Sequence, residues 1–308
     1  MKRLPLVALC VLLALAVGCA PSPATPTAPP SPTHEPIVVL PTSTPVPPPP
    51  TPTFTPAPTP AAQATPTPAA PTQATPTAAA PAKLTVPMIA IPASEFTMGS
   101  EREIERPPHK VPVPAFEIDQ FEVTNEQFAR FVKETAYKTT AEKTGDSSTW
   151  SAYAEGKPNH PVVKVSWNDA VAYCQWLGKR LPTEAEWEKA ARGTDERLYP
   201  WGNEWALGKA NTKEAGYRGT TIVGSLPGGA SPYGVMDMAG NVAEWTSDWF
   251  QPYPGYPGGD SAAQFFGQKY RVIRGGGWFS DKEMVRTTTR SCSSVDLAND
   301  DVGFRCAR

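Results

Sequence analysis

The chain has 308 residues, a formal net charge of −2 and only 19% charged residues, but its 38 prolines are unevenly distributed. Residues 21–82 hold 22 of these prolines and 14 threonines, with Glu35 as the only Asp, Glu, Lys or Arg, whereas all nine tryptophans lie between Trp150 and Trp278. Without the proline-rich segment, the remaining length predicts one globular unit of about 225 residues instead of two domains. The slightly negative net charge argues against nucleic-acid binding.

The N-terminus has the pattern of a bacterial lipoprotein signal. Lys2 and Arg3 precede an apolar run over residues 6–17, which suits an export signal and is short for a membrane span. Residues 15–19 resemble a lipobox, in which the cysteine is lipidated and becomes the mature N-terminus. We predict that residues 1–19 are this signal and that Cys19 anchors the exported protein to the outer face of a bacterial membrane. The alternative is an ordinary cleaved signal with an incidental cysteine.

Residues 20–83 are predicted to be a disordered Thr/Pro-rich linker. Their composition provides too little apolar surface to offset the entropy lost on folding. Because polyproline-II segments rise about 3.1 Å per residue, such a linker can reach on the order of 190 Å. It would hold the following domain away from the membrane.

The first expected elements of the domain are short strands and one helix. Met88 to Met98 and Val111 to Val123 have apolar residues interrupted by Pro or Gly, which is typical of short strands with turns. Thr124 with Gln127 forms a capping-box pattern, and apolar residues then follow at helical spacing. A helix of about three turns is expected to begin there.

Two more helices are expected in the middle of the domain. Asn168 and Asp169 are candidate caps of a helix that ends at Gly178. Thr183 and Glu186 form another capping box, and this third helix stops at a glycine, residue 193.

From Gly193 onward the chain is mostly Gly, Pro and aromatic loops. Two strands are expected in this part, Tyr270 to Trp278 and Val302 to Ala307. The mixture predicts an α+β domain in which loops predominate, so bound ions and a disulfide would help to hold it together.

Cysteines and histidines limit the chemistry of this domain. In an exported protein Cys174, Cys292 and Cys306 lie where disulfides persist, and three thiols allow one bridge with one cysteine left over. No cysteine pair has CxxC spacing, and His109 and His160 are the only histidines of the domain. Zinc catalysis and a Ser-His-Asp hydrolase therefore have too few candidate residues.

Six motifs follow one another along the domain. They are Val165-Ser166-Trp167-Asn168-Asp169-Ala170, Gly178-Lys179-Arg180-Leu181-Pro182-Thr183-Glu184-Ala185-Glu186-Trp187-Glu188, Pro200-Trp201-Gly202, Met238-Ala239-Gly240-Asn241-Val242-Ala243-Glu244-Trp245, Arg274-Gly275-Gly276 and Val302-Gly303-Phe304-Arg305. In content and order they resemble formylglycine-generating enzymes, also called sulfatase-modifying factors. The resemblance covers about residues 86–308 and implies a single domain over 84–308 with their α+β, loop-rich fold, which is related to C-type lectins. In active members, two cysteines just after an RGGS segment bind copper(I), and oxygen is used to convert a cysteine in a sulfatase CxPxR motif to formylglycine.

The sequence departs from this pattern at the positions that the resemblance assigns to catalysis. Ser280 occupies the first cysteine position, and residues 283–285 stand where the second cysteine would fall, in a loop about three residues short. Gly277 replaces the serine of RGGS, and Ala243 replaces a tryptophan. Since thiolates select the soft copper(I) ion and a serine hydroxyl does not, copper is not expected to bind.

The resemblance also implies a disulfide and calcium. It pairs Cys174 with Cys306 and leaves Cys292 as a lone thiol. The first calcium site implied would use the side chains of Asp237 and Glu244, and oxygen donors of this kind suit calcium. The alternative interpretation of these two carboxylates is a solvated turn and a helix cap. The remaining implied calcium ligands are the carbonyls of Gly240 and Val242 and, for a second site, Asn211 with the carbonyl of Thr212.

Two function classes follow. The first is a lipid-anchored, catalytically inactive binding module for an unknown peptide, glycan or protein at the cell surface. The second is an oxidoreductase that still converts a sulfatase cysteine to formylglycine. The missing thiolates favour the first, because a shared fold does not by itself transmit activity.

Overall fold

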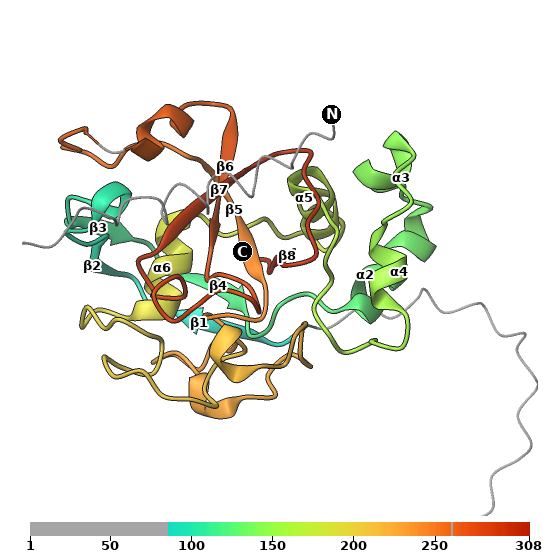
Figure 1. Cartoon of the computed structure of the whole chain (residues 1–308), viewed down its shortest axis with the longest axis horizontal. Coiled ribbons are helices and arrows are strands. Elements are labelled where there is room, and N and C mark those ends of the chain that lie inside the picture. Colours follow the sequence, from blue (N-terminus) through green and yellow to red (C-terminus); the bar gives the residue numbers. More distant parts are fainter. Residues whose placement is uncertain (1–85, 260) are drawn as a thin grey trace, which may run out of the picture. The chain divides into compact units, whose positions relative to one another are not determined.

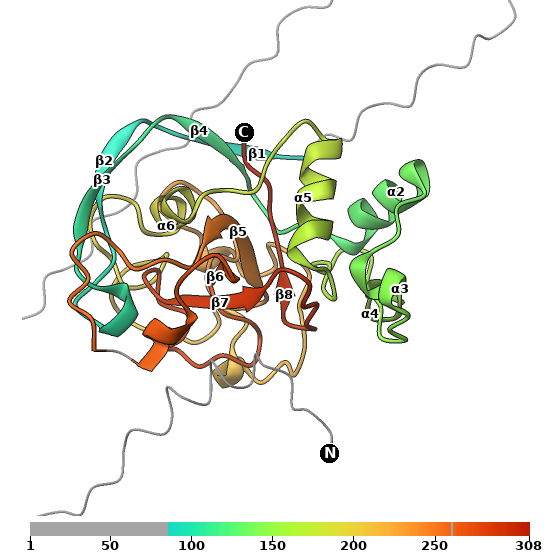
Figure 2. The same cartoon turned by 90° about the horizontal axis from the view of Figure 1, so that it is seen from above.

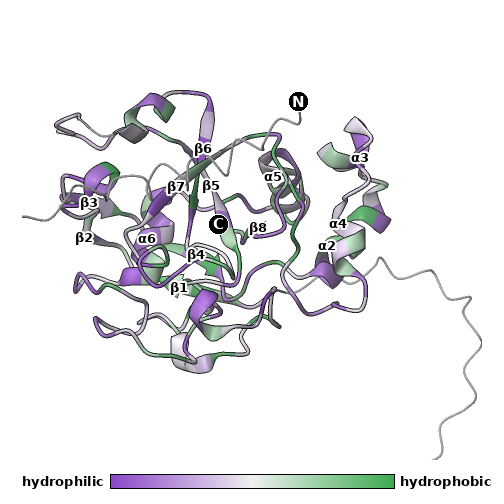
Figure 3. Cartoon of the chain, in the orientation of Figure 1, coloured by the Kyte–Doolittle hydropathy of each residue, from purple (hydrophilic) through white to green (hydrophobic). Residues whose placement is uncertain are grey.

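A computed structural model describes residues 86–308 apart from residue 260. The predicted signal, the lipidation of Cys19 and the whole of the predicted linker lie outside the described residues. Hydrophilic and hydrophobic residues alternate over short distances along the described chain (Figure 3). None of its helices is long and apolar enough to cross a membrane.

Two antiparallel strand pairs form the first part of the domain. β1 (Met88–Ile91) pairs with β4 (Phe116–Asp119), and β2 (Ser94–Met98) pairs with β3 (His109–Val113). Short strands were expected here. Pro92, Gly99 and Pro114 fall between the strands, whereas Pro112 lies within β3.

A four-stranded sheet lies at the centre of the domain (Figure 1). Its order is β7-β6-β5-β8, with β5 antiparallel to β6 and parallel to β8. The strands are β5 (Ala243–Trp249), β6 (Tyr270–Arg274), β7 (Arg290–Ser294) and β8 (Val302–Gly303). The strands expected near β6 and β8 exist but are shorter than predicted.

The strands β5 and β7 were not expected. β5 is buried at its first four positions, and the polar side chains on it are satisfied inside the protein. The hydroxyl of Thr246, for example, donates to the carbonyl of Val272 at 3.1 Å. A strand that buries polar groups in this way lacks the apolar–polar alternation by which half-buried strands are found.

The capping boxes at two helices are confirmed. α2 (Asn125–Thr135) begins after Thr124, and α6 (Glu184–Arg192) begins after Thr183, each with both reciprocal hydrogen bonds of a capping box. α6 ends at Gly193, as predicted. These signals are local, so the sequence is sufficient to place them.

The predicted N-terminal cap of α5 (Trp167–Trp176), the helix before α6, was wrong. α5 is capped by Ser166, whose hydroxyl accepts from the backbone N–H of Asp169 at 3.2 Å. Asp169 is the third helical residue and accepts from the N–H of Ser166 at 2.9 Å. The capping box therefore begins two residues before Asn168.

Further helices are short. α3 and α4 lie with α2 at one side of the domain, and α5 stands between them and the central sheet in both views (Figures 1 and 2). The bounds are α3 (Thr140–Thr144), α4 (Trp150–Ala154), and the 3-10 turns η1 (Glu103–Glu105), η2 (Lys213–Ala215), η3 (Pro227–Gly229) and η4 (Ser261–Phe265).

Two apolar clusters form most of the core. One joins α2 and α5 to the central sheet through Phe128, Tyr173 and Trp245. The other joins α6 to the first strands through Trp187 and Ile118. All five side chains are completely buried, so each helix is held mainly by the face that it buries.

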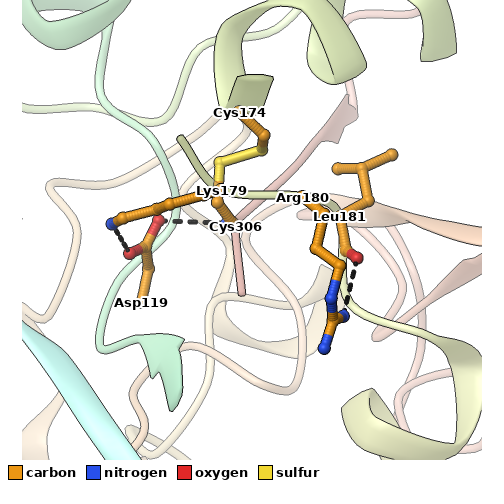
Figure 4. Close-up of a disulfide and its surroundings, with 6 residues drawn as sticks. All are labelled: Asp119, Cys174, Lys179, Arg180, Leu181 and Cys306. Atoms are coloured by element: carbon orange, nitrogen blue, oxygen red, sulfur yellow. Dashed lines mark hydrogen bonds and ion pairs between the residues drawn. A yellow bond between two sulfur atoms is a disulfide. The ribbon is translucent and has the colours of Figure 1, made fainter. Parts of the chain in front are cut away.

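A disulfide joins α5 to the segment after β8. Cys174 and Cys306 are both buried, and their Cα atoms are 5.6 Å apart (Figure 4). This is the pair that the resemblance implies. The backbone N–H of Cys306 donates to Asp119 of β4 at 3.0 Å, while Cys292 is buried on β7 beside Phe250.

The segment 302–308 contacts elements that are distant in sequence. Phe304 accepts a backbone hydrogen bond from Val123 at 2.9 Å. The backbones of Ala307 and Arg180 exchange two hydrogen bonds, at 2.7 and 2.9 Å, and those of Arg308 and Glu117 exchange two at 2.9 Å. This one segment therefore connects β4, the start of α2 and the loop before α6.

Candidate functional site

A cavity of about 490 Å³ lies where β6 ends. Its walls come from the start of β5, the end of β6, the loop that follows β6 and the residue before β8. Residues that line it include Ala243, Ile273, Gly277, Phe279, Ser280 and Asp301. The positions that the resemblance assigned to catalysis, Ala243, Gly277 and Ser280, are thus brought together at one cavity.

Ser280 closes a tight turn at this cavity. Its hydroxyl oxygen accepts from the backbone N–H of Gly277 at 3.1 Å, and its own N–H donates to the carbonyl of Gly277 at 2.9 Å. Gly276 has φ of +66°, and a Cβ atom there would lie 3.0 Å from the Ser280 hydroxyl and from Val285. The glycine is needed both for its backbone conformation and for this close approach.

The donor atoms at the cavity do not fit copper(I). None of the described residues that line it is a cysteine, and Met284 is the sulfur-containing side chain among them. One thioether without a thiolate partner is a weak ligand for this soft ion.

Asp301 is a cavity residue that the sequence did not single out. It lies next to Gly277, where a Cβ atom would be 2.9 Å from the Cβ of Asp301. Burial, together with the charge of neighbouring Asp300, raises the pKa of Asp301 to about 6. The available signal was its position directly before the Val302-Gly303-Phe304-Arg305 motif.

Buried ion pairs support the cavity from behind. Arg274 is completely buried and contacts Glu188, and its guanidinium also donates to the carbonyls of residues 287–289. Arg290 donates to both oxygens of Glu184, at 2.6 and 2.9 Å. Burial alone would raise the pKa of Glu184, but Arg290 and Arg274 hold it below its usual range. The charges behind the cavity are therefore paired.

The two carboxylates proposed as calcium ligands differ in burial: Glu244 is completely buried and Asp237 is half-buried. Glu244 lies on β5, where it accepts from Arg305 at 2.6 and 2.7 Å and from the indole of Trp187 at 2.9 Å. Asp237 accepts from the backbone N–H of Gly224 at 2.6 Å, and burial raises its pKa. The alternative interpretation of Glu244 as a helix cap is wrong, because this residue lies on β5 and is completely buried. Asp237 lies outside the helices and strands and is half-buried, so the turn interpretation is not contradicted for it.

The segments of the two implied calcium sites lie side by side. Asn211 forms a parallel bridge with Gly240, and its carbonyl accepts from the N–H of Asn241 at 2.8 Å. Its side-chain oxygen is buried and, among the described residues, has no hydrogen-bond partner. Such an orphaned oxygen fits a cation, although in the described part of the chain no group of three or more His, Cys, Asp or Glu is placed to hold a metal ion. Calcium here would depend largely on carbonyl oxygens.

Glu122 is a neighbour of this region that the sequence did not reveal. It is 1% exposed and accepts from the side-chain amide of Asn241 at 2.7 Å. Burial first, and then the charges of Asp237 and Glu244, raise its pKa well above the usual value. The sequence around Glu122 contains no motif that indicates its role, because its partners come from the distant segment 237–244.

Calcium removal gives a prediction for this region. Chelator should lower the melting temperature and added calcium should restore it, since a ligand that binds only the folded state contributes about 2.7 kcal/mol at a hundredfold excess over its Kd. Differential scanning calorimetry of the wild type and of Asp237→Asn measures the effect, and the variant should respond less. Identical melting with and without calcium in the wild type would remove the ion from this region.

Short strands and helices, long loops and a cavity beside a glycine-rich turn define a mixed α+β, loop-rich domain, as predicted. The sequence profile described as "Sulfatase-modifying factor enzyme 1-like domain" matches residues 73–308, so the chain belongs to this family. The chain is 36% identical over 287 residues to the formylglycine-generating enzyme of Bos taurus, covering 71% of this chain and 74% of that one.

Two other relatives are informative. The chain is 36% identical over 279 residues to the "Inactive C-alpha-formylglycine-generating enzyme 2" of Bos taurus, a match that covers 72% of this chain and 88% of that one. Among solved structures, PvdO from Pseudomonas aeruginosa is similar with a TM-score of 0.58 and 30% identity, over 72% of this chain and 93% of that one. The family thus includes relatives named as enzymes and relatives named as inactive.

Proposed function

We propose that this protein is a member of the family that does not generate formylglycine and that uses its cavity to bind a peptide, glycan or protein partner. The observation that carries the proposal is the cavity of about 490 Å³ lined by Ser280 and by no cysteine of the described chain. The Ser280 hydroxyl oxygen already accepts a hydrogen bond from the N–H of Gly277. As a metal ligand it is hard and stays protonated, so it does not replace a thiolate in binding copper(I).

The scaffold around the cavity supports a binding role. Buried pairs such as Arg274 with Glu188 fix its rear wall, so the shape of the cavity is preorganised. A preformed cavity lowers the entropy lost when a ligand binds. Similarity to a relative that is named as inactive also supports the proposal.

The decisive experiment combines metal binding and turnover. The full-length protein should show no tight copper(I) binding on titration and should convert no CxPxR peptide to formylglycine, measured by mass spectrometry with and without reductant. An active formylglycine-generating enzyme treated in parallel provides the positive control. Ser280→Cys alone should not restore turnover, because the second thiolate is still missing and Gly277 and Ala243 are unchanged. Oxygen-dependent product from the wild type would overturn the proposal in favour of the enzyme.

We propose further that the protein is exported and anchored by lipid at Cys19. The junction Gly18-Cys19 after a short apolar run supports the anchor, and the disulfide between Cys174 and Cys306 supports an extracytoplasmic location. Intact-mass measurement of the mature protein should find an acylated N-terminal Cys19. An unmodified N-terminus further along the chain would contradict the anchor.

A further inference from the structure

The cavity contains a buried carboxylate without a partner side chain. Asp301 is 8% exposed, and its carbonyl accepts from the N–H of Ala243 on β5 at 2.8 Å, which fixes its backbone. No other described residue donates a hydrogen bond to its carboxylate, and the charge of Lys164, which does not line the cavity, acts on it. A buried charge is costly unless it is paired, so Asp301 is a group that a cationic ligand would satisfy.

The other charged residues that line the cavity do not cancel this charge. Arg274 is occupied by Glu188 behind the wall. Glu283 pairs at the rim with Arg102, at 2.9 Å. The other charged residues that line the cavity are two carboxylates, Asp301 and Asp281, and one ammonium group, that of Lys213. The lining therefore has an excess of negative charge, which attracts cations.

The walls suit a long alkyl chain that ends in a cation. Ala243, Ile273 and Met284 provide apolar surface, and Phe279 at the cavity is 41% exposed. Lysine and arginine bury their methylene stems against such surface, and an aromatic ring adds a favourable contact with the cation. Because residue 277 is a glycine, no side chain from this position covers Asp301.

We propose that the cavity binds a basic side chain, lysine or arginine, of a peptide partner, with its alkyl stem along Ile273 and Phe279 and its cation at Asp301. This inference rests on the proposed binding function and specifies the chemistry of the partner. It assigns Asp301 as the residue that selects the ligand.

Matched peptides test the charge requirement. The full-length protein is titrated by calorimetry at pH 7.5 with acetyl-Gly-Lys-Gly-amide, with the same peptide carrying norleucine, and with one carrying glutamate. The lysine peptide should bind at least about tenfold more tightly than the norleucine peptide, a difference of about 1.4 kcal/mol, because only its cation can pair with the carboxylate that is already buried at Asp301. The glutamate peptide should bind more weakly than either.

Two variants separate the role of Asp301 from general charge and folding. Asp301→Asn should remove the preference for lysine, whereas Asp296→Asn, which removes the same charge outside the cavity, should keep it. The melting temperature of Asp301→Asn should equal or exceed that of the wild type, since a buried unpaired charge is lost. A folded Asp301→Asn protein that still prefers lysine would overturn the assignment.

The pH dependence is a second readout. Asp300 and Lys164 act on the Asp301 carboxyl, and Asp281, Glu283 and Lys213 share the cavity with it. Because burial raises the pKa of Asp301 to about 6, protonation should weaken binding of the lysine peptide about tenfold between pH 7.5 and pH 5. Binding of the norleucine peptide should not change, and lysine binding that is independent of pH would contradict the proposal.

The outcomes distinguish this inference from the function on which it rests. Equal affinity for the lysine and norleucine peptides, or binding of none of the three peptides, overturns the cation site and leaves the copper and turnover test unaffected. Turnover of a CxPxR peptide overturns the proposed function, whatever the peptides show.

Discussion

Replacing Arg305 by methionine is expected to lower the free energy of unfolding by about 3–5 kcal/mol. Arg305 is completely buried and pairs with Glu244, at 2.6 and 2.7 Å. Its guanidinium also donates to the carbonyls of Asp119, Gln120 and Met236. Without it, a buried carboxylate loses its cation and three carbonyls lose a donor.

Urea denaturation measures this change, and the chain supplies a matched control. Arg308 pairs with Glu117 at 2.5 Å, but the two side chains are 58% and 39% exposed. Exposed pairs are worth at most about 1 kcal/mol, so Arg308→Met should have a small effect. Adding Glu244→Gln to Arg305→Met should recover part of the loss, because the uncompensated charge is then removed. Similar costs for the two arginine variants would contradict a special role for the buried pair.

Loss of the disulfide should be about as damaging. Cys174 and Cys306 are separated by 132 residues, and removing a crosslink over a loop of this size is expected to cost about 2–5 kcal/mol. The double variant Cys174→Ala/Cys306→Ala should therefore melt at a lower temperature than the wild type. Reductant should destabilise the wild type and leave the double variant unchanged.

Peptide mapping without reductant checks the pairing itself. A linked peptide pair containing Cys174 and Cys306 is expected, with Cys292 in neither peptide. A linkage that involves Cys292 would contradict the structure, in which Cys292 lies in a separate cluster with Phe265 and Val272.

Local signals in the sequence were the most predictable part of the fold. The capping boxes at Thr124 and Thr183 depend on residues three positions apart, so they can be recognised without knowledge of the tertiary structure. β5 could not be recognised in this way, because Glu244 and Thr246 are acceptable inside the protein only with partners from other segments. Strand formation here depends on tertiary partners more than on local preference.

The sequence predicted some residues of the candidate site and not others. The resemblance located Ala243, Gly277 and Ser280, and the structure brings all three to one cavity. It did not locate Asp301 or Glu122, because what distinguishes both acids is burial and, for Glu122, also the charges of the distant residues Asp237 and Glu244. Sequence motifs mark where a site lies, whereas its electrostatics arise only when remote segments meet.

The contacts of segment 302–308 have a consequence for the order in which the chain can fold. β4 and the loop before α6 are made long before this segment, but both complete their hydrogen bonds only with Ala307 and Arg308. During synthesis these hydrogen bonds can therefore form only after well over a hundred further residues have been added. Contacts of such long range slow folding, because the entropy of closing the loop is lost before any contact forms. Part of the backbone of β4 and of the loop before α6 therefore has no partner until segment 302–308 has been synthesised.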